Sequence, residues 1–261
     1  DNNQYIVDTT PPTINSVGIT EADGVQNSFV NVPDEVTVTV TFSEAAPSTV
    51  NVDNASAAEI TIKVGDDNRT AEYDSGSGAA VSGNNYASLD FEYTIQAGDN
   101  DDDGISIPAN ALNSASITIS DAAGNVADNL THSAVPDNSS FKVDTISPWA
   151  NSFTMDDIEI IVDDNSTVGL VFSEVVILFN SDDDITHPNG ELSTMTSSDN
   201  ITWRGYFTPT DDIEDDNNTL SLANNSYTDL AGNNGPDNQT ANYEVDTREP
   251  TVSSVAITSA T

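Results

Sequence analysis

The feature that most constrains this chain is a set of three short motifs that recur in the same order. Val-Asp-Thr, with a proline within the next three residues, occurs at 7–9, 143–145 and 245–247. Phe-Ser-Glu occurs at 42–44 and 172–174, and Asp-x-Ala-Gly-Asn occurs at 121–125 and 229–233. Motifs that return in a fixed order mark a tandem array of repeated units.

The order of the motifs predicts two complete repeats. We expect domain 1 at residues 9–144 and domain 2 at 145–246, with the end of a preceding repeat at 1–8 and the start of a following one at 247–261. Each domain is long enough to build its own hydrophobic core, although the chain has no cysteine to cross-link it. A piece of such an array is expected to act as a spacer or a binding module.

Residue alternation predicts an all-β fold. Valine alternates with threonine over residues 36–41, and similar alternation occurs at 59–64, 89–95, 115–120, 158–162, 168–172, 203–207, 219–222 and 242–245. Glycine, asparagine, aspartate and proline separate these short segments, while helical periodicity is nearly absent. The pattern is typical of Ig-like β-sandwiches, one for each repeat.

This topology predicts where the recurring acidic residues lie. In an Ig-like sandwich, the loops after the second and sixth strands lie at the pole where the first strand begins. We therefore expect Glu44 and Asp121 beside the incoming segment of domain 1. By the same reasoning, Glu174 and Asp229 flank the incoming segment of domain 2, next to Asp144.

A further acidic loop, residues 98–104, follows the predicted strand at 89–95 and should point toward the same junction. Its segment from Asp99 to Gly104 fits the first half of an EF-hand loop, with Asp101 and Asp103 at alternate positions. The twelfth position is asparagine rather than the closing glutamate, so the sequence predicts a partial calcium loop. The alternative is a solvated hairpin tip.

Charge narrows the choice of partner. The chain has 44 acidic and 5 basic residues, a formal net charge of −39, and 32 of the acids are aspartate. Nucleic acids and anionic membrane surfaces are excluded as partners, because both require lysine and arginine. No segment is apolar for long enough to insert into a membrane. Adaptation to high salt or cold sea water is an alternative explanation of the acidity.

The convergence of carboxylates favours a calcium ion. Two like charges about 4 Å apart repel by about 4 kcal/mol at an effective dielectric near 20, so a cation is expected among them. Calcium takes six to eight oxygen ligands, whereas zinc prefers His or Cys and magnesium keeps more of its water. As alternatives, the Gly-Asn pairs are good turn formers, the preceding aspartates can cap those turns, and the glutamates can be solvated strand ends.

The ordered motifs resemble the bacterial Ig-like repeats of giant surface adhesins of the RTX and Bap biofilm types. The resemblance rests on the three recurring motifs together with the segments at 93–99, 103–112, 189–193 and 207–210. It implies an extended rod of domains at the bacterial cell surface, stiffened by calcium at domain junctions. It also implies Asp8, Asp144 and Asp246 as linker ligands, and neighbouring repeats of the same chain, without an obligate oligomer, as partners.

The sequence gives less support to two other functions. A glycan- or protein-binding module would use exposed aromatic residues, and the candidates are Trp149, Trp203, Tyr206 and Tyr86. Trp149 is expected at the domain junction and Trp203 in the core, so the sequence shows no aromatic cluster. An enzyme is not expected, because neither of the two histidines, His132 and His187, lies near a nucleophile motif.

Overall fold

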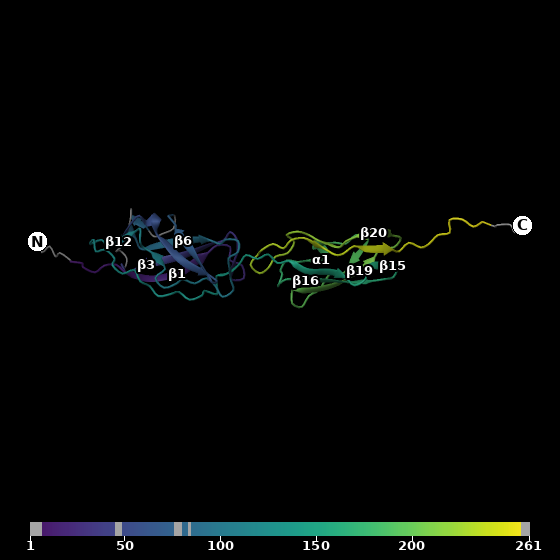
Figure 1. Ribbon diagram of the computed structural model, residues 1–261, viewed down its shortest axis with the longest axis horizontal. Helices are drawn as coiled ribbons and strands as arrows, with labels where there is room; N and C mark the ends of the chain where they lie inside the picture. Colours follow the sequence, from purple (N-terminus) through teal and green to yellow (C-terminus); the bar gives the residue numbers. More distant parts are fainter. Residues whose placement is uncertain (1–6, 45–48, 76–79, 83–84, 257–261) are drawn as a thin grey trace. The chain divides into compact units, whose positions relative to one another are not determined.

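A computed structural model describes residues 7–44, 49–75, 80–82 and 85–256 (Figure 1). Residues 1–6 of the predicted preceding repeat and 257–261 of the predicted following one lie outside the described residues. The chain divides into two compact units, residues 1–146 and 147–261. The division falls two residues beyond the boundary predicted from the motifs.

The first unit contains a six-stranded sheet and two smaller ones. The large sheet has the order β1 (Ile14–Ala22), β3 (Glu35–Phe42), β9 (Ser88–Thr94), β6 (Asp67–Tyr73), β5 (Glu59–Val64), β11 (Leu112–Asn113). The second has the order β10 (Asn100–Asp101), β13 (Lys142–Asp144), β2 (Phe29–Val30). The third has the order β12 (Thr118–Ser120), β4 (Val50–Asp53), β8 (Asn85–Tyr86), β7 (Ala80–Ser82), and a 3-10 turn, η1, spans Ala55–Ala57.

The second unit repeats this plan with fewer strands. Its four-stranded sheet has the order β14 (Ala150–Met155), β16 (Ser166–Phe172), β19 (Thr202–Pro209), β18 (Gly190–Leu192). A three-stranded sheet has the order β15 (Glu159–Ile161), β23 (Tyr243–Asp246), β20 (Glu214–Asn218). The last sheet has the order β17 (Ile185–Thr186), β21 (Ser221–Leu222), β22 (Asn238–Gln239).

Alternation explains the long strands of both units. In β3, Val36, Val38 and Val40 are fully buried while the threonines between them are half-buried. In β16, Val168 and Leu170 play the same part. Each buried valine or leucine side chain stabilises the fold by about 1.5–3 kcal/mol relative to leaving it in water. Each unit has its own core cluster, and each cluster draws from more than one sheet. The all-β prediction is thus confirmed.

Polar strands were not predicted from the sequence. β6 has Ala71 as its one buried apolar residue, and β20 consists of acidic residues and asparagines. Both strands are held by their neighbours, because β6 pairs with β5 and β9, and β20 pairs with β23. The three consecutive aspartates at 182–184 lie in a single helical turn, α1 (Ser181–Asp184), which is capped by Asn180. None of the helices among the described residues is long and apolar enough to cross a membrane.

Hydrogen bonds within the first unit fix which loops meet at which pole. The backbone N–H of Ser43, just after β3, donates to the carbonyl of Thr13 at 2.8 Å. The side-chain amide of Asn125, in the loop after β12, donates to the carbonyl of Asp8 at 3.2 Å. The loops after β3 and β12 therefore lie at the incoming end of β1, as the sandwich topology predicts.

Candidate metal centre

The Asp-x-Ala-Gly-Asn motif forms the same closed loop in both units. Asp229 is fully buried, and its two oxygens accept hydrogen bonds from the backbone N–H of Asn233 at 2.9 Å and from its side-chain amide at 2.8 Å. Asp121 makes the equivalent bonds to Asn125 at 2.8 and 2.7 Å. The side-chain hydrogen bond from Asn125 is the largest cause that lowers the pKa of Asp121 below its usual value. The loop of the first unit therefore favours the ionised form of Asp121, although little of this side chain meets water.

Glycine is required in this loop by the backbone conformation. Gly124 and Gly232 have φ values of 89° and 91°, in a region that residues with a Cβ atom rarely adopt. A Cβ atom added at Gly124 would meet no atom within 4 Å. The constraint is thus conformational rather than steric crowding, and it brings the asparagine back over the aspartate four residues earlier.

The aspartate of each Val-Asp-Thr motif also has a repeated local structure. One oxygen of Asp8, Asp144 and Asp246 accepts a hydrogen bond from the backbone N–H two residues further on, at 3.0, 2.9 and 3.3 Å respectively. This is the Asx turn, in which a short acidic side chain stabilises a bend of its own backbone. The turn holds the carboxylate of each aspartate against the backbone that directly follows it.

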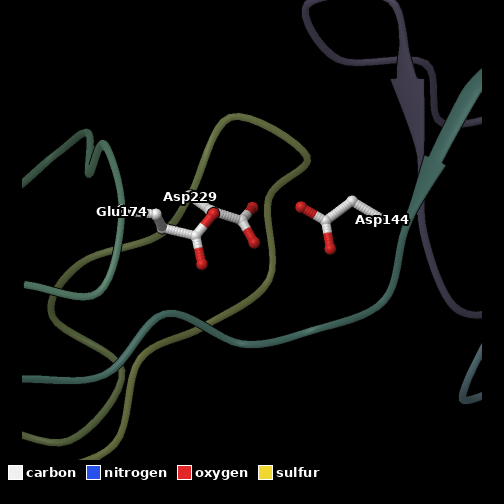
Figure 2. A group of neighbouring side chains, drawn as sticks. All are labelled: Asp144, Glu174 and Asp229. Atoms are coloured by element: carbon white, nitrogen blue, oxygen red, sulfur yellow. The ribbon is translucent and has the colours of Figure 1, made fainter. Parts of the chain in front are cut away.

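Three carboxylates from the three recurring motifs form one group. Asp144, Glu174 and Asp229 each offer an oxygen, and these oxygens all lie within 4.8 Å of one another. Figure 2 shows the three side chains pointing toward one another, with Glu174 and Asp229 on loops and Asp144 where a strand ends. Asp229 is buried and the other two are partly buried. An all-oxygen group of this kind suits a hard cation such as calcium and lacks the nitrogen or sulfur donors that zinc prefers.

The hydrogen bonds of Asp229 do not prevent it from binding a cation. Each of its oxygens accepts one hydrogen from Asn233 and, as a carboxylate oxygen, has a second lone pair. Asn233 therefore orients the carboxylate while leaving coordination capacity. This role of the asparagine was not predicted from the sequence, although its recurrence with the aspartate was the available signal.

The corresponding residues of the first unit are arranged less tightly. Asp8 is exposed, Glu44 is partly buried and Asp121 is buried. Among the described residues, they do not form a group as close as that of Asp144, Glu174 and Asp229. The contact of Asn125 with the Asp8 carbonyl nevertheless holds this segment beside the loop of Asp121.

The acidic loop at 98–104 uses two of its carboxylates inside the fold. Asp99 is buried, accepts from Arg69 Nε at 2.7 Å and from the Tyr93 hydroxyl at 2.6 Å, and so makes an ion pair. Asp101 is buried and accepts from the backbone N–H groups of Gly65 and Gly104, both at 2.7 Å. These contacts close turns instead of forming a shared cage.

Asp103 is exposed at the rim of a surface hollow that also includes Asp66, Asp102 and Lys63. Neither Asp103 nor the two buried aspartates of this loop belongs to a close group of three carboxylates among the described residues. Their assignment as calcium ligands remains a prediction without geometric support. Asp246 is exposed at the end of β23, where it accepts from the Arg248 N–H, and its assignment also remains a prediction.

Comparisons with known proteins support the fold. Residues 144–245 match the family described as bacterial Ig-like domain. All members of the group Asp144, Glu174 and Asp229 lie within this matched segment. The match covers most of the second unit and supports an Ig-like fold there. No curated protein matches the chain.

Several solved structures are similar over most of the chain. FdeC, described as a broadly conserved Escherichia coli adhesin, is 10% identical over 90% of this chain and 63% of its own, with a TM-score of 0.36. The I67–I69 fragment of titin is 9% identical over 92% of this chain and 66% of its own, with a TM-score of 0.33. This chain thus spans less than two thirds of the length of each.

The aromatic residues weighed for ligand binding are scattered. Trp149 is 48% exposed and donates from its indole N–H to Asn151, while Tyr206 is 61% exposed. Trp203 packs edge-on against Phe179 with ring centroids 4.9 Å apart, consistent with the predicted core position, and Tyr86 is buried.

The two histidines are engaged with the backbone. Nε2 of His132 accepts from the N–H of Ala111 at 2.8 Å, and Nδ1 of His187 lies 2.9 Å from the carbonyl of Gly190. These contacts give both rings a structural role.

Proposed function

We propose that this chain is an extender segment of a large bacterial surface adhesin, and that calcium bound by Asp144, Glu174 and Asp229 stiffens it. The observation that carries the proposal is the meeting of three carboxylates, one from each recurring motif, within 4.8 Å. The bacterial Ig-like family match over 144–245 supports the adhesin-type domain. The surface location and a distal ligand-binding region rest on the resemblance to RTX and Bap-type repeats.

Electrostatics favour a cation in this group. Two unit charges 4.8 Å apart repel by about 3 kcal/mol at an effective dielectric of 20, and by about 1 kcal/mol in bulk water. Because Asp144 and Glu174 are partly exposed, the repulsion lies between these limits. A divalent ion replaces repulsion by attraction, and backbone carbonyls and water would complete its six to eight ligands.

Recurrence of the motifs extends the proposal along the array. Asp8, Glu44 and Asp121 would form the equivalent site of the first unit, and Asp246 would serve the next repeat. Asp99 is the weakest of the predicted ligands, because Arg69 already neutralises it. A spacer needs no catalytic group, and we propose no enzymatic activity.

Calcium titration tests the metal site directly. With a dissociation constant of about 10⁻⁴ to 10⁻³ M, as in extracellular modules, 10 mM calcium would stabilise the loaded domain by about 1.4–2.7 kcal/mol. Glu174→Gln keeps the side-chain shape and removes one charge, so it should weaken binding at least tenfold. Glu191→Gln, an exposed glutamate of β18, is the matched control and should bind as the wild type does.

Calorimetry and thermal melting in EDTA, calcium and magnesium give the readout. No heat of binding and an unchanged melting temperature in 10 mM calcium would refute the metal site. The spacer role has a separate test, small-angle scattering. Stiffening by calcium predicts a larger maximum dimension of the chain with calcium than with EDTA. Equal maximum dimensions would refute the proposal that the metal stiffens the chain.

A further inference from the structure

The threonine of the Val-Asp-Thr motif makes the same pair of contacts in both units. In the first unit, the Thr145 hydroxyl donates to the carbonyl of Asp99 at 3.0 Å and accepts from the N–H of Gly98 at 3.0 Å. The backbone N–H of Thr145 also donates to the side-chain oxygen of Asn100 at 3.2 Å. Thr145 is thereby tied to the loop after β9.

Asp99 anchors that loop to the body of the domain. Its buried carboxylate bonds to Arg69 in β6 and to Tyr93 in β9. A continuous chain of hydrogen bonds therefore runs from the large sheet, through Asp99, to the first residue after β13.

Thr247 repeats the arrangement in the second unit with different partners. Its hydroxyl donates to the carbonyl of Thr210 at 2.7 Å and accepts from the N–H of Ile213 at 2.9 Å. Its backbone N–H donates to the carbonyl of Ile213 at 2.8 Å, and its side chain is buried. The loops at 98–100 and 210–213 share no sequence pattern, yet each meets the same threonine.

The serine of the Phe-Ser-Glu motif makes a matching contact at the opposite pole. The Ser43 hydroxyl accepts from the N–H of Thr13 at 3.0 Å, and the Ser173 hydroxyl accepts from the N–H of Trp149 at 3.0 Å. In each case the backbone N–H of the serine donates back to the carbonyl of the same residue, at 2.8 Å. Thr13 and Trp149 both directly follow the linker proline.

We propose that these two hydroxyl groups form a clamp that fixes both ends of the linker between the two units. The threonine fixes the first residue of the outgoing segment to its own domain, and the serine fixes the first residue after the proline to the next domain. Between Thr145 and Trp149, only residues 146–148 remain unclamped.

Those three residues have little torsional freedom of their own. The ring of Pro148 fixes its φ near −65°, and the residue before a proline is confined to extended backbone. The remaining rotation is concentrated at Ile146, whose N–H is held by Asp144. Before any metal binds, the linker is therefore short and its remaining freedom is confined to Ile146, which is the rotation left for calcium to restrict. The hydrogen bonds of the clamp do not themselves require the metal.

Hydrogen exchange of single amides in the full chain, measured by NMR in EDTA, tests the clamp without calcium. Thr145→Val keeps the side-chain shape but removes the hydroxyl. The Gly98 amide should then exchange about tenfold faster, as expected for the loss of a hydrogen bond, while the Trp149 amide is unchanged. Ser173→Ala should speed the exchange of the Trp149 amide by a similar factor and leave the Gly98 amide unchanged. Thr145→Ser keeps the hydroxyl, so both amides should exchange as in the wild type.

Two further measurements keep the result interpretable. The Val38 amide in the core of β3 should stay as protected in each variant as in the wild type, which shows that the domain is folded. Backbone order parameters of residues 145 and 149 should match the sheets in the wild type, and fall only at the clamp that is removed. Gly98 and Trp149 amides that exchange within twofold of the wild type in the two hydroxyl-removing variants would overturn the clamp, whatever the calcium titration shows.

Discussion

Replacing Asp229 by asparagine separates the structural and metal-binding roles of the most buried carboxylate. Asp229 is fully buried, and both of its oxygens accept from Asn233. An asparagine at position 229 has one acceptor oxygen, so its NH₂ group would face one of the two N–H donors of Asn233. One buried N–H group would therefore lose its partner, which costs about 1–3 kcal/mol.

This cost is measurable as a change in melting temperature. For a domain near 100 residues, 1 kcal/mol shifts the midpoint by about 4–8 °C, so we expect Asp229→Asn to lower it by about 10 °C in EDTA. The only two tryptophans of the sequence, Trp149 and Trp203, lie in the second unit. Intrinsic fluorescence therefore follows the unfolding of that unit selectively.

The control for this substitution is Asp237→Asn, which changes an exposed aspartate of the same unit. It removes the same charge and should move the midpoint by less than about 2 °C. Calcium should raise the midpoint of the control but not that of Asp229→Asn. A midpoint for Asp229→Asn within 2 °C of the wild type in EDTA would refute the argument that Asn233 depends on both oxygens.

Two further predictions concern the first unit. Arg69→Met leaves Asp99 as a buried carboxylate without its cation and should destabilise the unit by about 2–3 kcal/mol at pH 7, measured by calorimetry. Burial works to raise the pKa of Asp99, but hydrogen bonds from Tyr93, Gln96 and Arg69 outweigh it and lower that pKa. The stabilisation by ionised Asp99 is thus complete above the unfolded pKa near 3.9 and is lost as pH falls through the lower folded value, so the difference from wild type should shrink below about pH 4. A constant difference down to pH 2 would contradict this origin. Gly124→Ala should lower the free energy of unfolding by about 1–2 kcal/mol, because Gly124 has a φ of 89°. The control is Gly18→Ala, where the added Cβ also has no atom within 4 Å, and it should lower the free energy by less than about 1 kcal/mol. Equal losses in the two variants would show that φ does not matter.

Much of the fold could be predicted because its signals are local. The strands β3, β5, β9 and β16 follow from alternation, since every second side chain of a strand points to the same face of a sheet. The strands β6 and β20 could not be predicted in this way. Their own residues are mostly polar, and pairing with neighbours distant in sequence makes them strands.

The candidate site shows the same division. Recurrence of the motifs identified Asp144, Glu174 and Asp229 from the sequence, and the sandwich topology indicated that they would meet. The loop at 98–104 has a calcium-like spacing, but Asp99 turns toward Arg69, which lies 30 residues earlier. No spacing rule reveals such a partner, because the ion pair depends on which strands lie side by side.

From the sequence alone one can predict two repeats in this chain, the all-β class and which polar residues recur. Repetition and alternation are patterns along the chain, so they can be recognised without knowing the fold. The contacts that each recurring residue makes became visible only in the folded domain. Hydroxyl and carboxylate groups bond to whatever the packed core places within about 3 Å, and that arrangement is set by the burial of side chains across the whole domain.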